Sequence, residues 1–253
     1  MRSVVALAVA AAVVAGGYEP GSVPSEPAPR AAPSGRVLQV GHGGIQAAVD
    51  RARPGDTIRL GPGTYRGPVE IRGASKRGVR LVGERAIVRG TIRLRDSTAV
   101  AVRGIAVSGA VVVDGVDRYV LDGLRVSGGG VSVRRSAGGT IARVLAQGGT
   151  GPGIALTASP PQVHATRTFV RDVTVRANAV GIALDAVRAV TVSRARVLDN
   201  ATGVAASGAR EAVLTDSDVR GSHVGVSISA GDLLLVGNRL QSNVNDVVDP
   251  PEP

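Results

Sequence analysis

A motif of about 22 residues recurs through the last third of the chain and constrains its fold more than any other feature. Within RVLDNATGVA (196–205), Asn200 is followed three residues later by Gly203. The same spacing joins three further pairs: Asn178 and Gly181, Ser222 and Gly225, and Asn243 and Asp246. A fixed repeat of this length indicates stacked structural units, each of which buries its apolar face against its neighbours.

Alignment on the glycine that precedes each apolar pair extends the repeat toward the N-terminus. These glycines are Gly90, Gly109, Gly130, Gly153, Gly181, Gly203 and Gly225. Each unit holds short runs of alternating apolar and polar residues, the period of a β-strand with one buried face. Such strands cannot bury a core alone, but each can pair in parallel with its copy one coil away, about 4.8 Å along the axis. The repeat therefore predicts an all-β, single-stranded parallel β-helix, a solenoid of about eight coils.

Two columns of residues are expected to stack along the coils. The first is a structural ladder of Asn178, Asn200, Ser222 and Asn243. Each side-chain amide should bond to the next coil, and the glycine that follows should supply the left-handed backbone of the corner. The second column consists of Thr174, Arg196, Asp218 and Arg239, spaced 22, 22 and 21 residues apart on one outer face. We interpret both columns as structural, because exposed ion pairs contribute only about 0 to 1 kcal/mol each.

The two ends of the chain differ from the repeat in composition. Residues 1–17 place a basic start before an apolar run of signal-peptide length, shorter than the about 20 residues of a membrane span. Residues 18–36 have the Pro, Ser and Ala content of a linker, 37–248 hold the β-helix domain, and 249–253 form a C-terminal tail. Gly17 stands where a lipoprotein box has its cysteine, and the chain has none, so a lipid anchor and disulfides are both ruled out. We expect a secreted or cell-envelope monomer with no stable membrane span after signal cleavage.

The formal net charge of +10 is concentrated toward the N-terminal coils. Residues 51–103 contain 13 Lys and Arg against 4 Asp and Glu, whereas residues 168–253 contain 8 against 10. This asymmetry favours an anionic partner at the basic end. Nucleic acid is not expected, because Lys76 is the only lysine and aromatic residues, which would stack on bases, make up 2% of the chain.

Residues 45–65, IQAAVDRARPGDTIRLGPGTY, resemble the first segment of pectin-lyase-like right-handed parallel β-helix proteins. One face of a short helix here would gather Ile45, Ala48, Val49 and Ala52. That helix would cap the open N-terminal end of the stack, and Thr57–Leu60 would form the first strand. The resemblance covers about residues 37–248 and implies the fold. It leaves function open, because this fold hosts lyases, hydrolases, epimerases, esterases, adhesins and proteins with no known activity.

In enzymes of this fold the site usually lies on one outer sheet, on the strand that here follows each repeat glycine. The outward residues of its first four coils are mostly charged: Glu70, Arg72, Arg93, Arg95, Val112, Asp114, Ser132 and Arg134. Those of the last four coils are small and mostly neutral. Arg72, Arg93 and Arg134 are candidate substrate-binding residues, because a guanidinium binds a uronic-acid carboxylate through two hydrogen bonds.

The candidate catalytic residues are Lys76, Arg95 and Asp114. A β-elimination lyase must neutralise the carboxylate beside the proton that it abstracts, and it needs a base, for which Lys76 or an arginine of lowered pKa would have to serve. His164, in the insertion ASPPQVHATR (158–167), is a further candidate to overhang the groove. The alternative for the whole charged face is a solvated surface that keeps the protein soluble.

No cofactor is expected. The three histidines, His42, His164 and His223, do not share a column, and no dense acidic cluster supports Ca²⁺. Three hypotheses remain: a protein that binds an anionic polysaccharide or cell-wall polymer through its N-terminal coils, a polysaccharide-cleaving enzyme of the lyase type, or a structural envelope protein with no ligand. The scarcity of aromatic residues, on which sugar rings stack, weighs against the enzyme.

Overall fold

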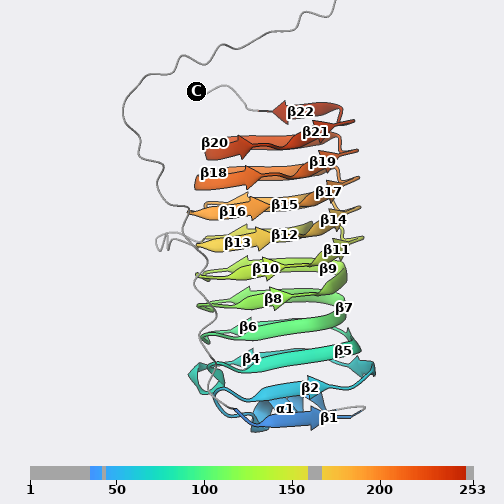
Figure 1. Cartoon of the computed structure of the whole chain (residues 1–253), viewed down its shortest axis with the longest axis vertical. Coiled ribbons are helices and arrows are strands. Elements are labelled where there is room, and N and C mark those ends of the chain that lie inside the picture. Colours follow the sequence, from blue (N-terminus) through green and yellow to red (C-terminus); the bar gives the residue numbers. More distant parts are fainter. Residues whose placement is uncertain (1–34, 42–43, 159–166, 249–253) are drawn as a thin grey trace, which may run out of the picture. The chain divides into compact units, whose positions relative to one another are not determined.

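Strands stack in parallel through the part of the chain that the structure describes. In the computed structural model this part is residues 35–41, 44–158 and 167–248, which form a parallel β-solenoid of about nine turns (Figure 1). The predicted all-β parallel β-helix is thereby confirmed. The eight predicted coils begin with Glu70, and the structure adds the strand Asn245–Val248 after the last of them on the same sheet. Thr57–Leu60 is the second strand rather than the first, since Val37–Val40 pairs with it in parallel.

Each turn contributes to three parallel sheets. The first sheet contains β1 (Val37–Val40), β2 (Thr57–Leu60), the starts of β5 (Arg80–Arg89) and β7 (Ala101–Asp114), β8 (Val120–Asp122), β10 (Thr140–Ala142), β13 (Thr168–Arg171), β16 (Val190–Ser193) and the ends of β18 (Thr202–Thr215) and β20 (Val224–Val236). The second contains β3 (Gly63–Arg66), the end of β5, the middle of β7, the start of β9 (Arg125–Arg134), β11 (Leu145–Gln147), β14 (Thr174–Arg176), β17 (Arg196–Leu198), β19 (Asp218–Arg220) and β21 (Arg239–Gln241). The third contains β4 (Val69–Arg72), β6 (Ile92–Arg95), the ends of β7 and β9, β12 (Pro152–Thr157), β15 (Val180–Asp185), the starts of β18 and β20, and β22 (Asn245–Val248).

Inward-facing aliphatic side chains fill the interior in continuous columns. One column of the first sheet is fully buried along eight turns: Ile58, Leu81, Val102, Leu121, Ile141, Val170, Val192 and Leu214. Because each strand pairs with its copy in register, every such side chain packs between two of its own kind. The alternation in the sequence thus becomes a dry core inside three solvated faces.

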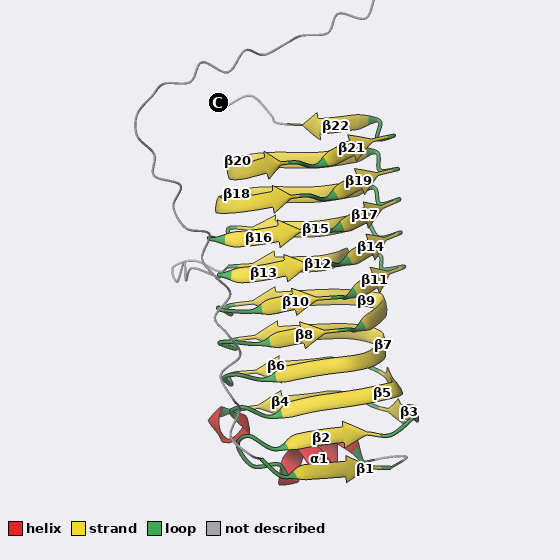
Figure 2. Ribbon diagram, in the orientation of Figure 1, coloured by secondary structure: helices red, strands yellow, loops and turns green. Residues whose placement is uncertain are grey.

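A short helix closes the N-terminal end of this core. Figure 2 shows α1 (Ile45–Arg51) as the red helix beside β1 and β2. Ile45, Ala48 and Val49 are buried, as predicted. The Gln46 side chain behaves like an added peptide group at the edge of β4: its Nε2 donates to the Glu70 carbonyl at 3.1 Å and its Oε1 accepts the Glu70 N–H at 2.8 Å. Within the described residues, no helix has the length and hydropathy needed to cross a membrane.

The asparagine ladder lies at the corner between the second and third sheets. The Asn200 side chain accepts the backbone N–H of Asn178 from the preceding turn at 3.0 Å, and Asn243 accepts that of Ser222 at 3.0 Å. Asn178, Asn200 and Ser222 are buried, as a ladder beneath the corner requires. Ser222 interrupts the amide bonding, because its hydroxyl oxygen is buried with no hydrogen-bond partner among the described residues. The ladder is therefore confirmed as a column but is incomplete at its third position.

The repeat glycines near the C-terminus serve a different purpose from the one predicted. Gly181, Gly203 and Gly225 are not in the left-handed region, which is occupied instead by residues such as Ala177 (φ 53°) and Asp199 (φ 54°), just before the ladder asparagines. A Cβ placed on Gly181 would lie 2.4 Å from the carbonyl oxygen of Gly203 on the next turn. Glycine is required there because the turns approach too closely for a side chain.

Candidate functional site

The third sheet presents the charged N-terminal face in the predicted register. One column runs through Glu70, Arg93, Val112 and Ser132, and the other runs through Arg72, Arg95, Asp114 and Arg134. Parallel in-register pairing places each of these side chains about 4.8 Å from the next along the axis. The sheet therefore brings together six of the sequence-predicted charged residues on four successive strands.

Arg95 lies at the centre of an ion network on this face. Its guanidinium is 3.8 Å from Glu70 on one side and 3.8 Å from Asp114 on the other. Asp114 also accepts a hydrogen bond from Arg135 at 2.8 Å. These contacts pair Arg95 and Asp114 with each other, so both candidate catalytic groups have their charges compensated by neighbours.

Two arginines on the same face are differently placed. Arg93 and Arg134 are exposed, and neither forms an ion pair with any residue in the described ranges. Arg72 has a long contact to Asp96, with Nε 3.7 Å from the carboxylate. The guanidinium groups of Arg93 and Arg134 are therefore open to solvent without a direct ion pair, and an anionic ligand can bind them at little desolvation cost.

The remaining candidates do not join this network. Lys76, in the 3-10 turn Ala74–Lys76, turns toward α1, where its ammonium donates to the carbonyls of Asp50 and Ala52 at 2.8 Å each. His164 lies outside the described residues. Tyr65 and Tyr119 are both buried, so neither offers a ring face to a sugar.

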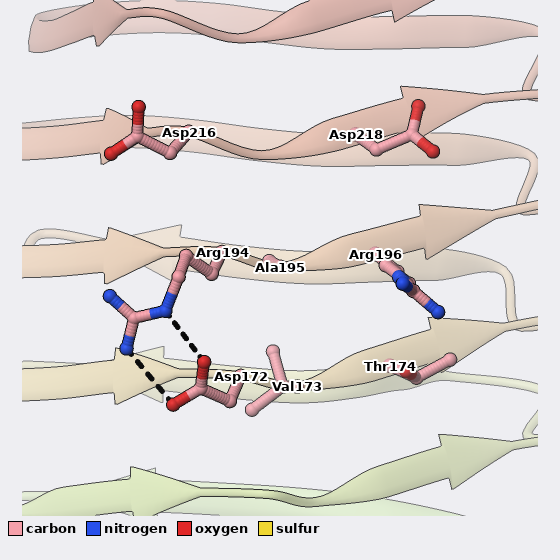
Figure 3. Close-up of a pocket in the computed structure, with 8 residues that line it drawn as sticks. All are labelled: Asp172, Val173, Thr174, Arg194, Ala195, Arg196, Asp216 and Asp218. Atoms are coloured by element: carbon pink, nitrogen blue, oxygen red, sulfur yellow. Dashed lines mark hydrogen bonds and ion pairs between the residues drawn. The ribbon is translucent and has the colours of Figure 1, made fainter.

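A hollow of about 460 Å³ lies at the corner between the first and second sheets in the C-terminal half (Figure 3). Its rim alternates in charge from turn to turn, through Asp172, Arg194 and Asp216 beside Arg196 and Asp218. Arg194 binds Asp172 through two hydrogen bonds of 2.7 and 3.0 Å. Hydrogen bonding to Arg194 lowers the pKa of Asp172, and the same contact raises the pKa of Arg194.

This corner was not predicted as a candidate site, although the signal was present in the sequence. Asp172, Arg194 and Asp216 are each spaced 22 residues apart, as the Asn ladder is. Arg194 and Asp172 form an ion pair with two hydrogen bonds, so we interpret this corner as a stabilising feature of the fold. The neighbouring column of Thr174, Arg196, Asp218 and Arg239 is in the predicted register.

A family model described as periplasmic copper-binding protein (NosD) matches residues 86–249, which is more than half of the chain. The chain belongs to the NosD family. No curated protein sequence matches it. The copper in the family's description can be tested against the donor atoms of this NosD-family chain, because copper in proteins is held by thiolate, thioether and imidazole groups.

These donors do not fit a copper site. The whole sequence has no cysteine, one methionine (Met1) and three histidines, of which only His223 lies in the described ranges. Those ranges also contain no cluster of three or more His, Asp or Glu placed to hold a metal ion. We therefore derive no chemistry through copper for this member of the family.

Several solved structures share the fold of this NosD-family chain. The mannuronan C-5 epimerase AlgE6 A-module of Azotobacter vinelandii is 13% identical, with a TM-score of 0.60 over 81% of this chain and 73% of that one. The AlgE4 A-module from the same organism is 16% identical, with a TM-score of 0.58 over 81% and 76%. An alginate lyase from Paenibacillus sp. str. FPU-7 is 12% identical, with a TM-score of 0.55 over 82% and 97%. At these identities the likeness establishes the β-helix fold alone.

Proposed function

We propose that this NosD-family chain is an exported cell-envelope β-solenoid that binds an anionic polysaccharide through the third sheet of its N-terminal coils. The observation that carries the proposal is the pair Arg93 and Arg134, which are exposed and form no ion pair with the described residues, on a face whose other arginines contact carboxylates. A guanidinium that lacks a protein partner is suited to a carboxylate of the ligand.

The face also has a geometry that suits a polymer. Its charged positions follow the solenoid axis, one strand after another, so that a chain lying along the axis meets a similar surface at each turn. Structural neighbours of this fold act on polymers named alginate and mannuronan, which supports a uronate polymer as the ligand class. The periplasmic description of the family supports a cell-envelope location.

Binding accounts for the face better than cleavage does. A lyase needs a base that is free to take a proton. Lys76 donates to two backbone carbonyls of the N-terminal cap, and Arg95 and Asp114 face one another. The three candidate catalytic residues therefore have structural partners, so no base is assigned and no cofactor is invoked.

The test is co-sedimentation of the full chain with alginate, pectate and hyaluronan, with ultraviolet absorbance recorded for new unsaturated ends. We expect retention on a uronate polymer that weakens as salt is raised, without absorbance growing over time. Arg93→Ala with Arg134→Ala should weaken retention strongly. The matched control is Arg210→Ala with Arg239→Ala, which removes the same charge from the C-terminal coils and should leave retention unchanged.

A further inference from the structure

A second groove, of about 270 Å³, lies on a different face of the solenoid. It crosses the second sheet over five successive turns, from β5 through β7, β9 and β11 to β14. Its lining includes Ile87, Ala106, Ser108, Arg125, Ser127 and Arg176. Four spacings of about 4.8 Å make it about 19 Å long, parallel to the axis.

The charges along this groove are of one sign. The basic residues of the lining are Arg125 and Arg176. Arg66 and Arg89 pair in register with each other just outside its N-terminal end, where Arg89 also pairs with the lining residue Ser108. The strand residues 63–66, 86–89, 105–108, 125–127, 145–147 and 174–176 contain no Asp or Glu. Like charges on paired positions are destabilising. The Arg66–Arg89 pair at the end of the groove therefore has an electrostatic cost that a bound anion would offset.

Arg176 is held in place without losing its charge. Its Nε and Nη2 donate to the Gln147 side-chain oxygen at 3.0 and 2.9 Å. Since the amide is neutral, the guanidinium is oriented but not compensated. The contrast with Arg95 on the third sheet, which lies between two carboxylates, makes this groove the more purely cationic surface.

The floor of the groove combines an apolar surface with hydroxyl groups. Ile87 is 41% exposed, unusual for an isoleucine on a sheet of small and polar residues, and Leu145 is half-buried. Ser108 and Ser127 place hydroxyls beside them. A sugar ring offers both C–H faces and hydroxyls to such a floor. The described strands of this sheet present no outward aromatic ring, because Tyr65 is buried, so nucleic-acid bases have no platform on which to stack.

We propose that this groove is a binding subsite for a segment of carboxylate-bearing polysaccharide lying along the solenoid axis. Arg125 and Arg176 of the lining and Arg89 beside its N-terminal end bind carboxylates of the segment, while Ile87 and Ala106 contact the apolar face of a sugar ring. The inference takes its ligand class from the proposed function but concerns a separate face, so the two can fail independently.

The test compares two double variants for binding of oligogalacturonate by calorimetry. Arg89→Ala with Arg125→Ala should weaken binding about tenfold or more, because hydrogen bonds to a charged group are lost. The unfolding midpoint should not fall, since Arg89→Ala removes the like-charge contact with Arg66. Unchanged affinity in this variant, together with loss in Arg93→Ala with Arg134→Ala, would overturn the subsite and leave the proposed function standing. Absence of uronate binding in the unaltered protein would overturn both.

A second measurement locates the ligand directly. The chain has no cysteine, so Ser127→Cys gives one thiol in the groove and Ser227→Cys gives one on the C-terminal part of the third sheet. Oligogalacturonate should slow alkylation of the Ser127→Cys protein and leave that of the Ser227→Cys protein unchanged. A neutral dextran oligomer should protect neither thiol. Equal alkylation rates at position 127 with and without the uronate would contradict occupation of the groove.

Discussion

The side-chain oxygen of Asn200 lies 3.0 Å from the backbone nitrogen of Asn178 and accepts its hydrogen across one turn of the solenoid. The Nδ2 of Asn200 donates to the carbonyl of Leu198 at 2.9 Å. One buried amide therefore satisfies backbone groups on two turns. At Ser222, one turn later, a buried hydroxyl with no partner among the described residues takes its place.

We expect Ser222→Asn to complete this ladder. The new amide would reach backbone groups as Asn200 does, and the free energy of unfolding should rise by about 0.5–1.5 kcal/mol. Chemical denaturation checks this. Ser222→Ala is the control and should be nearly neutral, because it removes a hydroxyl with no partner. A lower stability for Ser222→Asn than for Ser222→Ala would contradict the ladder as described.

Two neighbouring positions should respond in opposite ways to a change of one methyl group. Ala177 has φ 53°, so Ala177→Gly removes backbone strain and should stabilise the protein by up to about 1 kcal/mol. Gly181→Ala should destabilise it, because its Cβ would meet the Gly203 carbonyl oxygen at 2.4 Å. Thermal unfolding of both variants provides the measurement. Equal shifts of the same sign would show that the glycine positions have been misinterpreted.

Asp56 makes the N-terminal turns sensitive to acid. The buried carboxylate accepts hydrogen bonds from the Arg36 guanidinium at 2.8 Å and from the backbone N–H groups of Arg36 and Arg53 at 2.9 Å each. These bonds, led by that to the Arg36 side chain, hold the pKa of Asp56 below its ordinary value. A lowered pKa means stabilisation that is present above the unfolded value of about 3.9 and is lost as pH falls through the folded value.

Asp56→Asn should therefore lower the free energy of unfolding by about 1–3 kcal/mol at pH 7, since an amide nitrogen would face donors. The difference between the variant and the unaltered protein should shrink as pH is lowered below about 4. Urea denaturation between pH 7 and pH 3 gives both values. A difference that stays constant over this range would exclude the carboxylate's charge as the cause.

The fold could be predicted from the sequence, because the spacing between equivalent apolar residues gives the register in which successive turns pair. In-phase repeats of Ile58, Leu81 and Val102 can pack only if every turn pairs with the next, and the apolar face of the helix at 45–51 has a place only at the open end. The purpose of Gly181 was mistaken because spacing cannot separate a glycine needed for its dihedral angle from one needed for clearance. Only the distance to the next turn distinguishes them.

Less of the candidate site than of the fold could be predicted from the sequence. The columns of the third sheet were predicted, but their ion pairs were not, because side-chain direction decides whether Arg95 meets Asp114 or solvent. Lys76 turned away because its short 3-10 turn directs the ammonium to the helix carbonyls. The cationic groove on the second sheet was not predicted, because its residues belong to a different strand of each turn from the one that follows the repeat glycine.

Binding of an anionic polysaccharide by the N-terminal coils should be visible in the salt dependence of oligogalacturonate affinity. Isothermal calorimetry would compare the unaltered protein with Arg93→Ala plus Arg134→Ala and with the control Arg210→Ala plus Arg239→Ala. We predict binding that weakens steeply with salt in all three proteins, with the first variant keeping only the contribution of the groove on the second sheet. Equal affinity in all three proteins, or affinity that does not respond to salt, would contradict the account.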